Sequence, residues 1–445
     1  MTKHAVIIGG VAGGATAAAQ LRRLDSNIKI TIVEKGNHIS YSNCGIPYFI
    51  GGVVEKREKI LKETSEFAQK YDCDIRTASE ATKINRNEKK ITYKHIPSGK
   101  IESLDYDILI MSPGASPRIP DISGLPSQNA FTVKSIHDMD TIIDYMENTS
   151  PKNAAIIGGG FIGMEMAENL TISGLDVSII ERSEHVMGIM DADLAEVIQD
   201  ELKKKGVSLF VNEDVISIDS DGRTLRCKSG REIAADMIIL ALGITPNNQL
   251  AIDAGLEIGE ATNGILVNEY MQTNDPSIYA LGDVVETWDP IFQMPKQVPL
   301  AWPAHRQAFI IANHINGENI AYSGTFGTAI IKIFDLTAAM IGHNKTSLKK
   351  MNKPFNTTAI ESTSHASYYP KPGHLMMKVH YGPESRQIFG AQAVGTDGVD
   401  KRIDVLATAM KGNLTVDQLQ DLELAYAPPY SSPKDPVNIL GYKAK

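Results

Sequence analysis

The sequence predicts an α/β fold with two similar sheet-containing domains, followed by a smaller α+β domain. An apolar, β-branched run leads into a glycine-rich loop and a helical pattern near the N-terminus, and this succession recurs about 150 residues later. The chain of 445 residues exceeds what one hydrophobic core usually supports. From about residue 324 the pattern becomes strand-rich and has no glycine-rich loop. These observations predict three structural units.

The first unit begins with a predicted strand at 5–8, continues with a helix at 15–24, and ends with a strand at 29–33. Glycines between a strand and a helix let a pyrophosphate approach the helix N-terminus, and an acidic residue about 20 positions later binds ribose. Glu34 stands at that position, although Val11 replaces the middle glycine of the motif. The candidate dinucleotide contacts here are Gly9, Gly10, Ala12, Gly13, Gly14, Glu34 and Lys35.

The second unit repeats this pattern with all three motif glycines. A strand at 154–157 precedes the loop at 158–163, a helix runs to about residue 173, and a strand at 176–180 ends at Glu181. Two complete units are a strong indication of two Rossmann-like dinucleotide sites, because chance would have to supply strand, loop, helix and acid twice. The second set of candidate contacts is Gly158, Gly160, Phe161, Ile162, Gly163, Glu181, Arg182 and Gly243.

Two buried strands close these units, within 106–115 and 235–244, and each ends in a glycine turn, at Gly114 and Gly243. A further strand near 277–281 places Asp283 at the start of a predicted helix. Its carboxylate either caps that helix or holds the ribityl chain of a flavin.

The last part of the chain has predicted strands at 328–333, 338–342, 375–380 and 388–394, and a helix at 401–410. We expect this α+β region to serve assembly.

Composition restricts the function. Hydrophobic residues make up 42% and charged residues 22%, as in ordinary globular proteins, and the net charge of −9 disfavours nucleic acid as a partner. Cys44, Cys73 and Cys227 are too widely spaced for a disulfide framework or a metal site, which favours a reducing compartment. The N-terminus leads directly into a strand, and no apolar run approaches the roughly 18 residues of a membrane span. We expect a soluble cytoplasmic protein that binds no metal and no membrane.

The stretch 40–48 contains the cysteine of greatest interest. It is interpreted as a loop leading into a helix, with Pro47 in the first turn and Ser42 or Asn43 as the cap. Cys44 would then lie at the positive end of the helix, where the thiol pKa falls and the reactive thiolate is favoured. The alternative is a small apolar residue in a buried turn.

Taken in order, the two dinucleotide units, the motif at 279–283 and the C-terminal domain resemble the pyridine-nucleotide disulfide oxidoreductases, whose fold is glutathione-reductase-like. The resemblance covers essentially the whole chain. It implies an FAD-binding domain formed by 1–117 and 247–323, an NAD(P)H-binding domain at 118–246, and a homodimerisation domain at 324–445. FAD contacts would include Gly114, Asp283, Leu300 and Ala301.

Most members of that family carry two redox-active cysteines, but Ile39 stands where the partner of Cys44 would be. This selects the single-cysteine branch, and the segments 40–44, 368–370 and 425–431 are similar to coenzyme A disulfide reductases. Peroxidase relatives have a histidine where this chain has Ala12, and no histidine follows His380. The resemblance offers instead Tyr368 and Tyr426, supplied by the partner subunit, to stabilise the departing thiolate. Without that context they would be packing residues.

The implied reaction uses NADH, NADPH or both to reduce coenzyme A disulfide to two coenzyme A thiols, through FAD and a Cys44 mixed disulfide with coenzyme A. Glu181 favours NADH, whereas Arg182 could neutralise a 2′-phosphate. A basic patch including Arg22 and Arg23 would bind the phosphates of coenzyme A. The substrate contacts implied are Thr16, Gln20, Arg23, Ser40, Asn43, Arg306 and Lys434.

Two alternatives remain open. One is an NADH oxidase or peroxidase, or a related reductase of coenzyme A persulfide or polysulfide, with Cys44 as a sulfenate. The other is a redox-sensing or electron-carrying flavoprotein that binds a partner protein.

Overall fold

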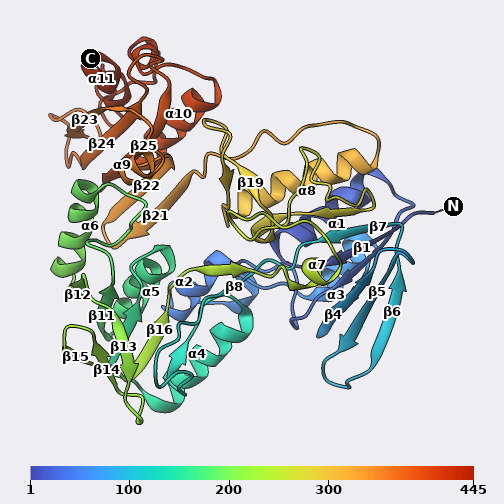
Figure 1. Ribbon diagram of the computed structural model, residues 1–445. Coiled ribbons are helices and arrows are strands. Elements are labelled where there is room, and N and C mark those ends of the chain that lie inside the picture. The colour runs from blue at the N-terminus through green and yellow to red at the C-terminus, as the bar shows by residue number, and fades with distance from the viewer. Residues whose placement is uncertain (1, 445) are drawn as a thin grey trace.

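The computed structural model describes residues 2–444, and its first sheet is assembled from two distant parts of the chain (Figure 1). All five strands are parallel, in the order β18-β7-β1-β2-β3. Their bounds are β1 (His4–Ile8), β2 (Lys29–Val33), β3 (Asp74–Arg76), β7 (Ile108–Met111) and β18 (Ile278–Ala280). Because β18 pairs with β7, the chain returns to this sheet after more than one hundred intervening residues.

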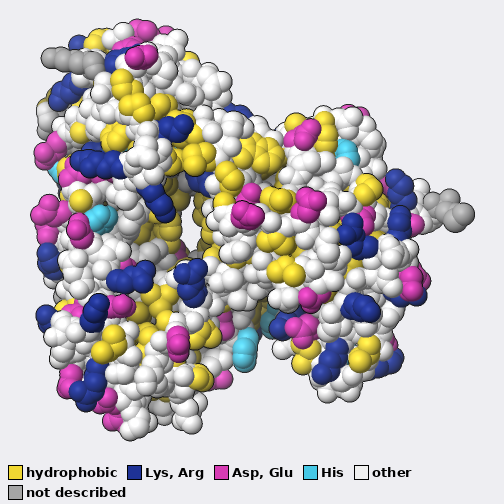
Figure 2. Space-filling view, in the orientation of Figure 1, with side chains coloured by type: hydrophobic (Ala, Val, Ile, Leu, Met, Phe, Trp, Pro, Cys, Tyr) yellow, Lys and Arg dark blue, Asp and Glu magenta, His cyan; other side chains and the backbone are white. Residues whose placement is uncertain are grey.

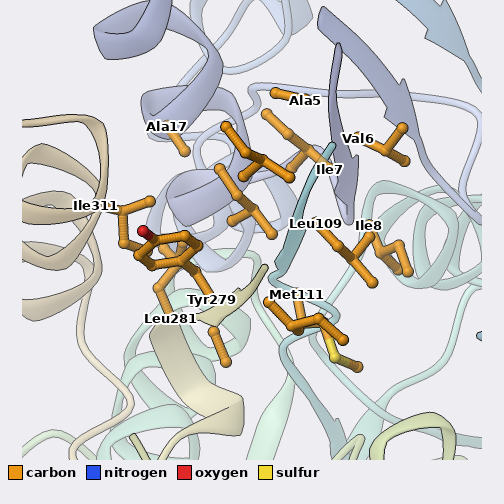
Figure 3. Close-up of a cluster of buried hydrophobic side chains, with 14 of the residues drawn as sticks. Ala5, Val6, Ile7, Ile8, Ala17, Leu109, Met111, Tyr279, Leu281 and Ile311 are labelled. Carbon is orange, nitrogen blue, oxygen red and sulfur yellow. The ribbon is translucent and has the colours of Figure 1, made fainter. Parts of the chain in front are cut away.

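The core of this half joins the sheet to two helices. Helix α1 (Ala12–Leu24) packs against α8 (Ala301–Ile315), and side chains from both meet the strands. Figure 3 shows Ala17 of α1 and Ile311 of α8 in the same cluster of buried side chains as Ile7, Leu109 and Leu281. Strand residues such as Ile7 and Leu109 are buried because helices or other elements cover both faces of a parallel sheet.

The second sheet repeats the arrangement, with parallel strands in the order β12-β11-β10-β16-β9. Its strands are β9 (Ala130–Phe131), β10 (Asn153–Ile157), β11 (Asp176–Glu181), β12 (Ser208–Val211) and β16 (Met237–Leu240). Its helices are α4 (Ile136–Thr149), α5 (Phe161–Ile172) and α6 (Ala192–Lys204). The two predicted strand-loop-helix-strand units are therefore confirmed.

The chain crosses between these sheets twice, and the two crossings pair with each other. Strands β8 (Ala115–Pro117) and β17 (Ile244–Pro246) run antiparallel at this point. The remaining small strands are β4 (Ser79–Asn85), β5 (Lys90–His95), β6 (Ile101–Asp105), β13 (Val215–Ile218), β14 (Thr224–Cys227), β15 (Glu232–Ala234), β19 (Thr287–Trp288) and β20 (Pro295–Lys296). Short helices are α2 (Ile46–Ile50), α3 (Thr64–Tyr71) and α7 (Gln249–Asp253).

The C-terminal part is an antiparallel sheet in the order β21-β22-β25-β24-β23. Its elements are β21 (Ala329–Ile333), β22 (Leu336–Gly342), α9 (Lys345–Lys350), β23 (Asn356–Thr363), β24 (His374–Tyr381), β25 (Ile388–Gly395), α10 (Val399–Lys411) and α11 (Pro436–Lys443). Helix α10 contacts β22 and β25, α11 contacts β23, and α6 of the second half contacts β21, β22 and β25. The α+β expectation is confirmed, whereas β23 was not predicted.

The expected helix at Asp283 is wrong, and the predicted domain boundaries are not tested. Asp283 lies in a single 3-10 turn, Gly282–Val284, and the next α-helix is α8, so no helix begins at Asp283. The predicted domain boundaries after residues 117, 246 and 323 stay predictions.

The face seen in Figure 2 is hollowed between the α6 and β21 side and the β19 side, and basic and acidic side chains are interspersed across it. Within residues 2–444, no helix has the length and apolar character needed to cross a membrane.

Candidate active site

A cleft of about 690 Å³ opens where the strands of the first sheet end. In open parallel sheets, ligands bind beyond the carboxyl ends of the strands. The cleft brings together thirteen of the predicted site residues, namely Gly9, Ala12, Gly13, Thr16, Arg23, Glu34, Ser40, Asn43, Cys44, Gly114, Asp283, Leu300 and Ala301. It thus joins the first glycine-rich loop, the cysteine loop and the segment after β18.

The first glycine-rich loop has a backbone that suits a pyrophosphate. Gly9 has φ of +94°, and a Cβ there would lie 2.1 Å from the carbonyl oxygen of Ser112. A Cβ on Gly14 would lie 1.8 Å from the carbonyl oxygen of Gly9, so only glycine allows α1 to approach the strand this closely. Val11, by contrast, has φ of −92°, which any residue adopts. The φ angle at this position therefore does not require the missing middle glycine.

The two predicted ribose-binding glutamates are held in the same way. Glu34 Oε2 accepts a hydrogen bond from the Gly10 N–H at 2.7 Å, and its Oε1 accepts one from the Gly36 N–H at 2.6 Å. Glu181 likewise accepts from the Gly159 N–H and the Ser183 N–H, each at 2.7 Å. Each carboxylate oxygen keeps a second acceptor position, so both glutamates fit a ribose hydroxyl at the strand end.

The basic residues that follow these glutamates, Lys35 and Arg182, are exposed. Lys35 is exposed and forms an ion pair with Glu80 at 2.8 Å, outside the cleft lining. Arg182 is exposed beside Glu181.

In the second unit, a Cβ on Gly163 would lie 2.0 Å from the carbonyl oxygen of Gly158, which repeats the close approach of Gly14 to Gly9. A Cβ on Gly160 would meet no atom within 4 Å, so this glycine leaves space at the N-terminus of α5, where Phe161 and Ile162 begin the helix. Gly243 has φ of +90° and also borders open space. These positions fit a second dinucleotide.

The cysteine loop differs from the predicted capped helix. A 3-10 turn, Asn43–Gly45, precedes α2, whose N-cap is Gly45 and whose first turn contains Pro47 as predicted. The cap prediction is wrong, because neither Ser42 nor Asn43 caps a helix with its side chain. The Asn43 amide instead donates a hydrogen bond to the carbonyl oxygen of Lys134 at 3.0 Å and ties the loop to another part of the chain.

The predicted fall in the thiol pKa of Cys44 is also wrong. Cys44 is accessible from the cleft, but the surrounding walls remove part of its water, and this burial raises the pKa of the thiol. The Glu165 carboxylate raises it further, while the Lys134 ammonium and a backbone hydrogen bond lower it. A five-residue helix such as α2 has too weak a dipole to outweigh desolvation.

Two charged residues of this site were missed by sequence reasoning. Lys134 lines the cleft and forms an ion pair with Asp283, with 2.9 Å between Nζ and Oδ2, so Asp283 faces the cleft rather than capping a helix. Glu165 lies on α5, and burial, followed by the repulsion of Glu168, raises its pKa to about 7. Both belong to the segment around the second sheet, and no local pattern places them near Cys44.

The predicted substrate contacts divide into two groups. Thr16, Arg23, Ser40 and Asn43 line the cleft, together with the unpredicted aromatic rings of Phe67 and Tyr71. Gln20, Arg306 and Lys434 are not among the lining residues, and the rings of Phe309 and Tyr442 lie under the Arg306 and Lys434 cations.

Arg22 does not serve the expected basic patch. Its guanidinium donates hydrogen bonds to the carbonyl oxygens of Tyr71, Ser26 and Asp72 at 3.0, 2.5 and 2.7 Å. Arg22 therefore holds α3 and the loop after α1 in place, while Arg23 faces the cleft.

The two predicted tyrosines lie together in the C-terminal domain. Their hydroxyl oxygens are 3.2 Å apart, although Tyr368 is 74% exposed and Tyr426 is 45% exposed. The hydrogen bond with Tyr368 raises the pKa of Tyr426. Neither side chain lines the cleft of its own chain. No cluster of three or more His, Cys, Asp or Glu side chains suited to a metal ion occurs among residues 2–444.

Two nucleotide-type loops, a cleft with one cysteine and a C-terminal antiparallel sheet define a class of flavin-dependent oxidoreductases. The family model described as pyridine nucleotide-disulphide oxidoreductase matches residues 3–308, and the dimerisation domain of that family matches residues 328–435. The chain belongs to the pyridine nucleotide-disulphide oxidoreductase family. This family implies FAD and NAD(P)H as cofactors and a C-terminal domain that dimerises.

Individual proteins that are similar to this chain have names that are more specific than the family name. The coenzyme A disulfide reductase of Staphylococcus haemolyticus is 40% identical over 442 residues, which is 99% of both chains. The crystal structure of reduced Bacillus anthracis CoADR-RHD matches with a TM-score of 0.98 and 44% identity, over 99% of this chain and 80% of that one. An NAD-dependent persulfide reductase from A. fulgidus matches with a TM-score of 0.95 and 38% identity, over 99% and 82% of the two chains.

Proposed function

We propose that this protein is an NAD(P)H-dependent flavoprotein that reduces coenzyme A disulfide. One NAD(P)H, one proton and one disulfide are converted to NAD(P)⁺ and two coenzyme A thiols. Support comes from the relatives of that name at 40% identity over nearly the full chain. We also propose that it acts in the cytoplasm, in keeping with its three free cysteines.

One observation carries the mechanism: among residues 2–444, Cys44 is the only cysteine that lines the cleft. Ile39, which stands where a second redox cysteine would be expected, is 1% exposed and lies in the interior. Cys73 packs against the core of the first sheet, and Cys227 is buried beside the second. Neither of these cysteines lines the cleft with Cys44, which supports the proposal that the substrate supplies the other sulfur.

FAD, when bound, accepts a hydride from NAD(P)H and returns two electrons to a sulfur atom. The first glycine-rich loop would hold its pyrophosphate, Glu34 its ribose, and Asp283 its ribityl chain. The Cys44 thiolate attacks one sulfur of coenzyme A disulfide, forms a Cys44 mixed disulfide and releases one coenzyme A thiolate. Two-electron reduction of that mixed disulfide releases the second coenzyme A and restores the Cys44 thiolate. Lys134 favours this thiolate, because its positive charge lowers the pKa of Cys44.

We further propose that Tyr368 and Tyr426 act on the cleft of the partner subunit. A phenol donates a hydrogen bond to a departing thiolate and stabilises its charge. The pair is exposed on the C-terminal domain and does not line the cleft of its own chain. This placement supports the proposal that the two hydroxyl groups complete the cleft of a second copy.

Mass spectrometry of the intact, freshly purified protein tests the reaction. A coenzyme A adduct that is lost on reduction and is absent from Cys44→Ser supports the proposal. A one-oxygen adduct on Cys44 would indicate an oxidase or peroxidase instead, and an unmodified Cys44 would indicate an electron carrier.

Complementation tests the shared site. A Cys44→Ser chain, which is inactive alone, is mixed under conditions of subunit exchange with a Tyr368→Phe/Tyr426→Phe chain, whose own turnover is low but measurable. Heterodimers then contain one intact site and regain activity. If exchange is verified with tagged chains and no activity returns, the tyrosines do not act across the interface.

A further inference from the structure

The tyrosine pair depends on two loops that are far apart in sequence. Tyr368 lies in the loop between β23 and β24, and Tyr426 lies in the segment between α10 and α11, 58 residues later. Both side chains are exposed, so packing around the rings does little to hold the hydroxyl groups 3.2 Å apart. The geometry of the pair must come from what holds the two loops together.

A buried arginine of α10 contacts both loops. Arg402 is 1% exposed, the least usual environment for a guanidinium, which is rarely buried unless it is paired. Its acceptors are the carbonyl oxygen of Ser364 at 2.7 Å, Asp435 Oδ2 at 3.0 Å, the carbonyl oxygen of Gly398 at 3.1 Å, Ser431 Oγ at 3.3 Å and the carbonyl oxygen of Tyr430 at 3.4 Å. Ser364 belongs to the Tyr368 loop, whereas Tyr430, Ser431 and Asp435 belong to the Tyr426 segment.

Asp435 completes the connection. Its carboxylate pairs with Arg402, accepts from the Ser431 hydroxyl at 2.6 Å, and caps α11 through the Val437 N–H at 3.0 Å. Burial raises the pKa of this carboxyl, but hydrogen bonds from Ser431 and the Val437 N–H, followed by the Arg402 guanidinium, hold it below its ordinary value. The pair is therefore charged, and the planar fork of arginine fixes direction as well as distance.

Few other contacts join the loops. The Ala366 N–H donates to the carbonyl oxygens of Pro428 and Ser431 at 3.3 and 3.1 Å. Lys401 Nζ reaches the carbonyl oxygen of Ala425 at 3.4 Å. Lys401, also on α10, contacts only the Tyr426 segment in these interactions and lies 3.6 Å from Asp435 Oδ2, whereas Arg402 bonds both loops from the same helix.

We propose that Arg402, paired with Asp435, is a positioning residue that sets the separation and direction of Tyr368 and Tyr426. The inference rests on the proposed role of these tyrosines. Replacing a buried ion pair by apolar residues is often neutral or even stabilising, so net stability is a weak explanation for this pair, and the proposal assigns it a geometric role. Arg402 touches no substrate and acts only through the two hydroxyl groups.

A double-mutant cycle on the FAD-loaded dimer tests this. Arg402→Lys keeps the positive charge but removes the planar guanidinium that donates several hydrogen bonds in fixed directions. We expect kcat for coenzyme A disulfide to fall about 10- to 100-fold while KM changes less than about twofold, since small misplacements of reacting groups have effects of this size. Reduction of the bound flavin by NADH, followed by stopped flow, should be unchanged. In the Tyr368→Phe/Tyr426→Phe background, the same substitution should change kcat by less than about twofold, because the groups it positions are gone.

The control is Arg386→Lys. Arg386 forms a two-pronged pair with Asp417 in the same domain, at 2.7 Å for Nε and 2.5 Å for Nη2, at a point of the chain before the stretch 425–435 that contains Tyr426 and the Arg402 acceptors. It should leave kcat within about twofold of the wild type. If Arg402→Lys fails to yield a flavin-loaded dimer, Ser431→Ala replaces it in the same cycle. This substitution removes a hydroxyl that hydrogen-bonds to both Arg402 and Asp435.

The results distinguish failure of the positioning role of Arg402 from failure of the proposed role of the tyrosines. Equal losses of kcat in both tyrosine backgrounds, or no loss in either, overturn the positioning role of Arg402. Wild-type turnover in the Tyr368→Phe/Tyr426→Phe chain overturns the proposed role of the tyrosines, and the positioning role with it.

Discussion

Glu165 is expected to destabilise the protein at neutral and alkaline pH. Its side chain is half-buried on α5, and desolvation together with Glu168 raises its pKa from 4.5 to about 7. The folded chain therefore binds this proton more tightly than the unfolded chain does. The carboxyl is protonated in both states below about pH 4.5, and stability then falls as the pH rises towards 7. The shift corresponds to about 3 kcal/mol, at about 1.4 kcal/mol per pKa unit.

The substitution Glu165→Gln removes this penalty. The variant should be more stable than the wild type by up to about 3 kcal/mol at pH 8, and by less than about 1 kcal/mol at pH 5. Hydrogen exchange of the α5 amides in increasing urea gives the measurement, because a chain with several domains does not unfold in one step. Glu196→Gln, on the exposed surface of α6, is the matched control and should change stability by less than about 0.5 kcal/mol at either pH.

Cys44 supplies a second measurement on the same variant. The Glu165 carboxylate raises the pKa of the Cys44 thiol, so Glu165→Gln should shift the pH profile of Cys44 alkylation by iodoacetamide to lower pH. A variant with wild-type stability at pH 8, or one whose advantage does not shrink at pH 5, would refute the reasoning about Glu165. An unchanged alkylation profile would show that its charge does not reach the thiol.

Three further predictions concern the cofactors and the cysteines. Asp283→Ala should lower the amount of FAD retained per chain after gel filtration, read from the visible absorbance, because Asp283 lines the cleft where the ribityl chain would lie; full occupancy would contradict this assignment. Cys44→Ser should abolish disulfide reduction but preserve flavin reduction by NAD(P)H, whereas Cys73→Ser and Cys227→Ser should keep wild-type turnover; a folded Cys73→Ser or Cys227→Ser chain without turnover would rule out a single-cysteine mechanism. The ratio of kcat/KM for NADH and NADPH should stay below about one hundredfold, equivalent to about 2.7 kcal/mol, and a larger ratio would show that either Glu181 or the neighbouring arginine does not reach the ribose.

Local sequence patterns were sufficient for the two nucleotide-type units. A strand followed by a glycine-rich turn and a helix is encoded within about 30 residues, and the acidic residue at the next strand end is part of the same unit. For this reason Glu34 and Glu181 could be assigned, and the structure gives them matching hydrogen bonds. Strand β23 was missed because its sequence is rich in threonine and serine and lacks a strong apolar alternation.

The chemistry of the site was decided by contacts between distant segments. The sequence identified Cys44 as the cysteine of interest, but the sign of its pKa shift depends on Lys134 and Glu165, which lie about 90 and 120 residues away along the chain. The same holds for Arg402, whose acceptors come from two loops. Propensity and periodicity report which side chains share one helix or strand, because those spacings are fixed by backbone geometry. Which charges meet in a cleft depends on how the sheets pack, and only the tertiary structure determines that.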